Sequence, residues 1–321
     1  MKQIFLIGLG AGAATALLVA SVKSGALVSL VLFQLAALPI LIAALGWSHW
    51  AGLVAAAFAA LILATILSPS VFFSFLVGIG LPAWWLGYLA LLARPAPDAP
   101  DRMEWYPVGR LVTWAAILAA GAVIAAIANF GLDDESFRSG LSNQFERALR
   151  RQAGLSPEEP LKIPGVENPA MFIALLVAII PIFGAMFATL TSFTNLYLAG
   201  RIVNISGLLK RPWPSLPNMQ FPPFVPALFA VAIAGTFLSG LVGTIAVIIA
   251  VSLSMAYGAL GFAVLHVITG GMNARAFLLT VAYVASFTIG WPILLAIMLG
   301  LADAIFNFRG RVAGTPPASR T

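Results

Sequence analysis

The residues best suited to chemistry lie within one short stretch, 189–195, where a long apolar run fills with hydroxyl and amide side chains. These are Thr189, Thr191, Ser192, Thr194 and Asn195. Thr191 and Asn195 are four residues apart, so on a helix they share one face. Such groups bind ligands through hydrogen bonds, and their burial is costly without a partner. We predict a ligand-binding patch of Thr191, Thr194 and Asn195, with the alternative that the hydroxyls bond back to their own helix.

Three further side chains complete the predicted ligand-binding set, namely Tyr257, His266 and Asp303. Tyr257 and His266 share an uncharged run with Gly258 and Gly261, which admit a close neighbour. His266 lies near the end of that run, so the alternative for its side chain is an interfacial position. Asp303 is the one acidic residue near the end of an apolar run.

Two amides stand alone in other apolar runs. Gln34 lies in the run expected to form a helix over 25–45, and Asn129 in the one over 111–131. A single amide within a membrane helix is more often an interhelical hydrogen bond than a ligand contact. We expect each to be such a bond.

The sequence contains few of the residue combinations that enzymes use for catalysis. The only histidines, His49 and His266, lie in different apolar runs, and no H-E-x-x-H or other metal-ligand spacing occurs. No apolar run holds paired carboxylates for acid–base catalysis, and no base is evident for a serine nucleophile. No Lys follows a Gly, so a phosphate-binding loop is excluded, and the absence of Cys excludes thiol chemistry. We predict no enzyme, no metal and no cofactor.

The elements that position these residues follow from the distribution of charge. Of 321 residues, 61% are hydrophobic and 9% are charged, against roughly 25% charged in soluble proteins. Six runs hold no Asp, Glu, Lys or Arg, namely 3–22, 24–93, 111–132, 168–200, 212–274 and 276–302. A membrane-spanning helix needs about 20 apolar residues, and barrel strands would alternate polar and apolar residues, which these runs do not. The sequence predicts an all-α polytopic integral membrane protein.

We expect about nine transmembrane helices in one bundle, with eight or ten as alternatives. Their predicted ranges are 3–20, 25–45, 50–67, 71–93, 111–131, 169–199, 224–240, 243–270 and 276–302. Residues 1–131 form an N-terminal five-helix part and 170–302 a C-terminal four-helix part of the same bundle. An extramembrane loop, 132–169, separates them, and 303–321 is predicted as a basic disordered tail. The Pro-rich connection 94–110 is predicted as a loop.

The loop 132–169 contains a predicted amphipathic helix over 134–153. Phe137, Leu141, Phe145 and Leu149 recur every four residues and form one apolar face on a charged helix. That pattern suits a helix lying on the membrane surface. A helix packed against the rest of the chain is the equal alternative.

The net charge of +6 comes from basic residues that sit singly at span ends, where they act as topological anchors. This pattern favours the lipid bilayer and excludes nucleic acid as a partner. Counting Lys and Arg near the spans predicts a cytoplasmic N-terminus in a bacterial inner membrane, although the basic tail opposes it when nine spans are counted. An uncleaved first helix is the simpler interpretation of 3–20, with a signal peptide as the alternative.

Four stretches resemble one family of bacterial membrane proteins. They are ALPILIAALGWSHWAGLVAAAFAALILATIL (37–67), NLYLAGRIVNISGLLKRPWPSLPNMQFPPFVP (195–226), YGALGFAVLH (257–266) and GLADAIFNFRGR (300–311). In these the chain resembles the YybS-like proteins, whose closing Asp-x-x-Phe-x-x-Arg pattern matches Asp303, Phe306 and Arg309. That family often has Gln where this chain has Leu260, so the resemblance does not support a polar site at Gly261.

The YybS-like family is in turn similar to the substrate-binding (S) subunits of energy-coupling-factor vitamin transporters. Those subunits use a small-residue stripe on their first helix to dock a transmembrane partner. Ala16 and Ala20 match that spacing, so the resemblance implies a membrane partner there. The rod-shape protein MreD is similar at the same remote level, which implies a role without transport.

Two functions therefore stand as hypotheses. In the first, the chain binds a small molecule between the helices 169–199, 243–270 and 276–302, as a transport subunit whose ATP coupling comes from partners. In the second, it is a scaffold for envelope machinery that docks partners on the helix 133–153 and on the proline-rich segment 212–226.

Overall fold

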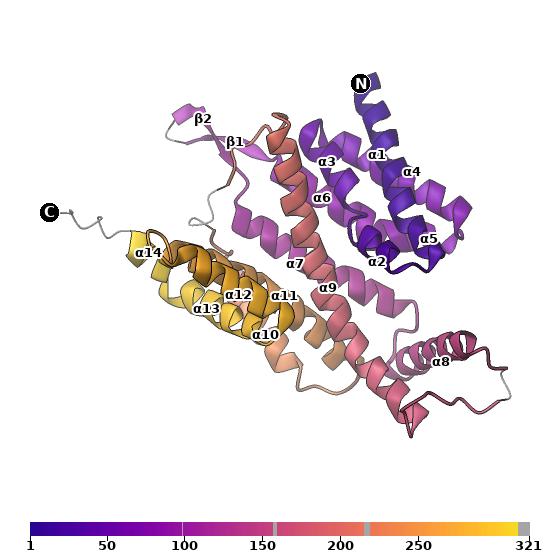
Figure 1. Cartoon of the computed structure of the whole chain (residues 1–321). Coiled ribbons are helices and arrows are strands. Elements are labelled where there is room, and N and C mark those ends of the chain that lie inside the picture. The colour runs from indigo at the N-terminus through magenta and orange to yellow at the C-terminus, as the bar shows by residue number, and fades with distance from the viewer. Residues whose placement is uncertain (98, 157–158, 215–218, 314–321) are drawn as a thin grey trace.

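The computed structural model describes residues 1–97, 99–156, 159–214 and 219–313, which are almost entirely helical (Figure 1). The α-helices are α1 Lys2–Ala20, α2 Leu27–Gln34, α3 Leu38–Gly46, α4 His49–Ile66, α5 Ser70–Phe75, α6 Leu81–Ala90, α7 Val108–Ala128, α8 Asp134–Ala153, α9 Pro169–Ile205, α10 Phe224–Gly235, α11 Gly240–Ile268, α12 Arg275–Thr288, α13 Pro292–Phe306 and α14 Phe308–Ala313. A 3₁₀ turn, Ser21–Ser24, follows α1, and a π-helical turn, Leu76–Gly80, joins α5 to α6. Two antiparallel strands, β1 Ala93–Ala96 and β2 Ala99–Trp105, form a hairpin.

The fold class predicted from the sequence is confirmed, with fewer spans than nine. By length and composition, seven helices of the described chain are able to cross a membrane, and eight if one bent pair counts as a span. The predicted helix 224–240 is reduced to α10, whose 12 residues rise only about 18 Å, short of the ~30 Å hydrocarbon core. The predicted helix 276–302 is broken into α12 and α13, which bend by 120°. Gly290 at the break has a φ of +84°, a conformation that glycine adopts without strain.

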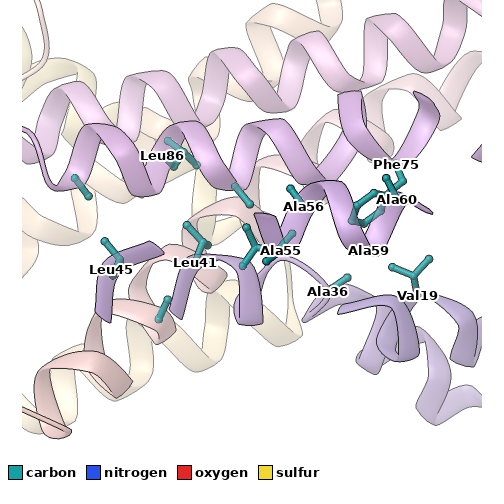
Figure 2. Close-up of a cluster of buried hydrophobic side chains, with 14 of the residues drawn as sticks. Val19, Ala36, Leu41, Leu45, Ala55, Ala56, Ala59, Ala60, Phe75 and Leu86 are labelled. Carbon is teal, nitrogen blue, oxygen red and sulfur yellow. The ribbon is translucent and has the colours of Figure 1, made fainter. Parts of the chain in front are cut away.

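Small residues pack the N-terminal helices closely. Figure 2 shows Ala55, Ala56 and Ala59 of α4 within the buried cluster formed with α1, α3 and α6. A Cβ at Gly12 of α1 would lie 2.7 Å from the carbonyl oxygen of Ala55, so this contact needs glycine. The small-residue stripe of α1, which includes Ala16, is thus buried against α4 within the chain.

The longest helix, α9, links the two parts of the bundle. Its 37 residues correspond to roughly 55 Å, and the helix continues past the expected end at residue 199. In Figure 1 it runs between the N-terminal helices and the orange and yellow C-terminal group, and it contacts α3, α7 and α11. Side chains from both halves can therefore meet on its faces.

The amphipathic helix α8 turns its apolar face to the rest of the chain. Phe137 and Leu141 are buried in a cluster with Ile127 of α7 and Ile173 and Val177 of α9. This arrangement matches the alternative of packing within the chain for that part of the apolar face. Asp133 caps the helix and accepts a hydrogen bond from the Ser136 N–H at 2.8 Å, and Gly154 ends it with a φ of +66°.

Two segments differ from the sequence predictions. The expected loop 94–110 contains the β1–β2 hairpin, where Arg94 and Glu104 form an ion pair of 3.0 Å. The expected disordered tail is helical through residues 303–306 of α13 and through α14. A buried ion pair, described below, holds these residues in place. Residues 314–321 of the predicted tail lie outside the described residues.

Candidate functional site

A break between α2 and α3 brings polar groups of α1, α2 and α9 together. Pro39 has no N–H to continue the helix, so α2 ends at Gln34 and α3 begins at Leu38. Two carbonyl groups near the break accept side-chain hydrogen bonds instead. The Asn195 Nδ2 donates to the Gln34 carbonyl at 2.7 Å, and the Thr15 Oγ1 donates to the Ala36 carbonyl at 3.0 Å. Neighbouring helices thereby stabilise the broken helix, as lipid surroundings require.

Thr191 and Asn195 meet Gln34 on the face of α9 that turns toward this break. The Thr191 Oγ1 donates to the Gln34 Oε1 at 3.1 Å. Asn195 is fully buried, and its Nδ2 also donates to the Thr191 carbonyl at 2.9 Å. Its Oδ1 is buried and accepts no hydrogen bond within the described part of the chain. A buried acceptor without a donor is uncommon and marks a place where a further group can bind.

These three residues line a groove of about 480 Å³, which we call the α9 groove. Its walls come from α2–α3, α5–α6, α7, α8 and α9 and include Phe33, Ile79, Leu86, Leu118, Val123 and Ile180. Its lining holds no Asp, Glu, Lys, Arg or His. The volume falls within the range of small-molecule sites, roughly 300–1,000 Å³. An apolar groove with a few amide and hydroxyl groups suits an uncharged ligand, since a charge would be desolvated there without a counter-ion.

The hydroxyls on the same stretch of α9 behave in two ways. The Oγ1 of Thr189 donates to the Ala185 carbonyl at 2.7 Å, and the Oγ of Ser192 donates to the Ala188 carbonyl at 2.9 Å. Both follow the alternative of bonding back to their own helix. Thr194 is exposed on α9 and does not line the groove.

Tyr257 lies apart from the groove, on α11. Its ring is buried between Phe221 and Phe229, with ring centroids at 5.3 and 5.1 Å. Its hydroxyl group has no hydrogen-bond partner within the described residues. His266, further along α11, places its Nδ1 2.8 Å from the Phe262 carbonyl.

Asp303 belongs to a buried ion pair. Its Oδ2 lies 2.8 Å from the Arg309 Nε, and its Oδ1 accepts the Arg309 backbone N–H at 3.0 Å. Arg309 also donates from Nη2 to the Met219 carbonyl at 2.6 Å. The carboxylate therefore joins α13 to α14, and the Arg309 guanidinium joins α14 to the proline-rich segment.

The structure thus divides the predicted site. Thr191 and Asn195 face the N-terminal helices. Tyr257 lies where α11 packs against α13, Asp303 pairs with Arg309, and His266 lies against Tyr283 of α12. Gln34, expected as an interhelical hydrogen bond, makes one with Thr191 and also lines the groove. Pro39 was the sequence signal for its position, because a proline-interrupted apolar segment often marks a ligand site in membrane transporters.

Comparisons with known proteins extend this description. Neither the curated proteins nor the solved structures give a match to the chain. A comparison with family models matches residues 13–304, and the chain therefore belongs to the family described as predicted membrane protein (DUF2232).

Proposed function

We propose that this membrane protein binds a small, uncharged and mostly apolar molecule in the α9 groove, as the substrate-binding subunit of a transport system. The observation that carries the proposal is the buried Oδ1 of Asn195, an acceptor without a donor at the wall of an apolar groove. A ligand hydroxyl or amide N–H would donate to this oxygen. The amide group of Gln34 carries N–H donors that would bind a ligand oxygen.

The broken helix α2–α3 supports a transport role. Many secondary transporters place their substrate at discontinuous helices, where backbone groups are free of the helical ladder. Here the break lies at the groove, and its carbonyl groups depend on side chains of α1 and α9. A ligand that binds Gln34 or Asn195 would therefore change the hydrogen bonds that stabilise the break between α2 and α3.

Energy coupling would come from partners, because the sequence holds no phosphate-binding loop. The resemblance to S subunits implies a partner on the stripe of Ala16 and Ala20. Ala16 is buried within the chain, so we propose that a partner would contact the other face of α1. That face exposes Phe5, Leu6 and Leu17.

We also propose a bacterial inner-membrane location with a cytoplasmic N-terminus. If the bent pair α12–α13 counts as one span, the count is eight, and an even count puts the basic tail on the same side as Lys2. A reporter that is active only in the periplasm, fused after residue 321, should be silent. Activity of that fusion would contradict this topology.

The groove is tested by filling it. A Cβ at Gly184 of α9 meets only Val123 side-chain atoms, at 3.7 and 3.9 Å, and Gly184 lines the groove. Gly184→Leu should fit without a backbone clash and occupy the groove. Gly121→Leu is the matched control, because Gly121 of α7 is exposed and has nothing within 4 Å of its added Cβ.

The measurement is thermal unfolding of the detergent-purified full chain against a panel of uncharged amphiphiles, such as long-chain alcohols, amides and monoacylglycerols. We expect at least one class to raise the Tm of the wild type and of Gly121→Leu but not of Gly184→Leu. Equal shifts in all three proteins, or no shift with any class, would contradict the proposal.

The outer face of α8 favours a second function, a scaffold for envelope machinery. This face is hollowed between Asn143, Arg147 and Arg151, and both arginines are exposed. An acidic protein surface would fit there. Deleting α8 would also remove the buried Phe137 and Leu141, so the cleaner test is the double variant Arg147→Glu and Arg151→Glu. Loss of a reproducible partner in pull-downs, with an unchanged Tm, would favour this function; retention of every partner would exclude this face.

A further inference from the structure

A second cavity lies outside the α9 groove, and one of the side chains that line it is positively charged. It has a volume of about 360 Å³ and lies among the ends of α6 and α9, the start of α7 and the segment 209–214. Its walls are apolar, including Leu45, Leu111, Val112, Phe193, Leu196 and Met219. Arg211 lines it as well, and we call it the Arg211 cavity.

The guanidinium of Arg211 is fixed by backbone carbonyl groups. Its Nη1 donates to the Ala90 carbonyl at 3.1 Å, and its Nη2 donates to the Tyr106 carbonyl at 3.3 Å. Its Nε is buried and has no acceptor within the described residues. Two of the five N–H donors are thus used, which holds the guanidinium in one orientation and leaves the Nε–H available to a further acceptor.

The charge of Arg211 has no ion-pair partner among the described residues. No acidic side chain from that part of the chain lines the cavity. Burial lowers the pKa of Arg211, the direction expected when desolvation is not offset by an anion. Buried cations in proteins are normally paired, so this arrangement favours an anionic ligand.

The mouth of the cavity has the character of a membrane interface. Trp213 packs edge-on against Tyr197 with ring centroids 5.9 Å apart, and the guanidinium carbon of Arg201 lies 5.3 Å from the Trp213 ring. Lys210 donates to the Trp47 carbonyl at 3.2 Å. Trp and Tyr gather at the headgroup level of membranes, and nearby Lys and Arg attract anionic lipids.

We propose that the Arg211 cavity binds an anionic phospholipid, with the headgroup phosphate at Arg211 and part of one acyl chain within the apolar walls. A phosphate oxygen would accept the free Nε–H in a charge-assisted hydrogen bond. A free phosphate ion offers the same oxygen atoms, but it would leave the apolar walls unfilled. This site stands independently of the α9 groove.

Lipid retention by the full chain tests the proposal. Detergent-purified protein is titrated with phosphatidylglycerol or phosphatidylcholine and followed by native mass spectrometry. We expect phosphatidylglycerol to bind about tenfold or more tightly than phosphatidylcholine. We expect Arg211→Gln to abolish that preference and Arg201→Gln to keep most of it, because Arg201 lies over Trp213 and does not line the cavity.

A second variant keeps the test valid if Arg211→Gln fails to fold. A Cβ at Gly200 meets only the Trp213 ring, at 3.5 and 3.8 Å, so Gly200→Leu should fill the cavity and leave Arg211 in place. It should also lose the tightly bound phosphatidylglycerol. Wild-type affinity in the folded variants, or equal binding of both lipids by the wild type, would overturn the proposal. Displacement of phosphatidylglycerol by millimolar inorganic phosphate would assign the site to a free anion and overturn the lipid assignment.

Discussion

Two buried polar clusters of this molecule differ in whether their hydrogen bonds are complete. Around Asp303, both carboxylate oxygens accept bonds from Arg309, and Arg309 continues to the Met219 carbonyl. Around Asn195, the Nδ2 has two acceptors but the Oδ1 has no donor within the described residues, and the side chain lines a groove. Burial alone therefore does not distinguish the two clusters, and our proposal of a site at Asn195 rests on the unpaired oxygen beside a groove.

The largest effect should come from breaking the complete cluster. Asp303→Asn removes the carboxylate from Arg309, and removal of one partner of a buried pair costs about 3–5 kcal/mol. The measurement is the free energy of unfolding of the detergent-solubilised chain. Arg94→Gln is the control, because its pair with Glu104 is exposed, with 76% and 40% of the side chains accessible, and such pairs contribute about 0–1 kcal/mol. Equal losses in the two variants would contradict the contrast between the clusters.

The α1–α4 contact, like the Asp303 cluster, leaves no room for a further group. A substitution there should have the next largest effect on stability. A side chain at Gly12 meets the Ala55 backbone, so Gly12→Leu should cost about 1–3 kcal/mol through overpacking. Gly10→Leu, with nothing within 4 Å of its Cβ, should cost less. The readout is again unfolding of the isolated chain. If Gly12→Leu leaves the isolated chain unchanged, the stripe is not needed for packing within the chain.

A smaller effect is expected within the α9 groove. Thr191→Val keeps the shape of the side chain but removes its hydrogen bond to Gln34, at a cost of about 0.5–1.5 kcal/mol. Thr194→Val, three residues along and exposed, should stay within about 0.5 kcal/mol of the wild type. Thermal unfolding of both variants measures this. A larger loss for Thr194→Val would place the important hydroxyl on the other face of α9.

The smallest effect concerns α8, whose Phe137 and Leu141 line the groove. The hydrogen bond from the Ser136 N–H lowers the pKa of Asp133 from its ordinary value of 3.8. The cap is thus fully effective above that pH and is lost as the pH falls through the lowered pKa. Amide hydrogen exchange should show protection of the first turn of α8 declining in acid. Asp133→Asn should show no such decline. If the protection of the wild-type first turn does not change with pH, Asp133 does not stabilise α8 through its charge.

The sequence predicted the elements better than the site. Uncharged runs located most spans, because the bilayer selects directly for them. The count of nine was too high because α10 is too short to span and α12 and α13 are bent by 120° at Gly290, and neither feature changes the uncharged runs from which the spans were counted. The predicted helix 134–153 matches α8, whose ends are set by local capping at Asp133 and Gly154.

Uncharged runs and capping residues do not reveal which polar residues come together in one site. Gln34 and Asn195 are 161 positions apart, and only the packing of α9 on the broken helix brings them together. Asp303 and Tyr257 also lie in or beside long apolar runs, but Asp303 pairs with Arg309 and Tyr257 packs against aromatic rings, both apart from the groove. Residue type predicted their burial but could not tell a satisfied group from an open one.

Photolabelling tests the central claim most directly. A long-chain alcohol that carries a diazirine would be bound to the full chain, activated and mapped by peptide mass spectrometry. The account predicts concentrated, saturable labelling of groove residues such as Val123, Gly184 and Ala188, which is lost in Asn195→Leu. Labelling no stronger there than on α12, which has no buried residue, would contradict a ligand site in the α9 groove.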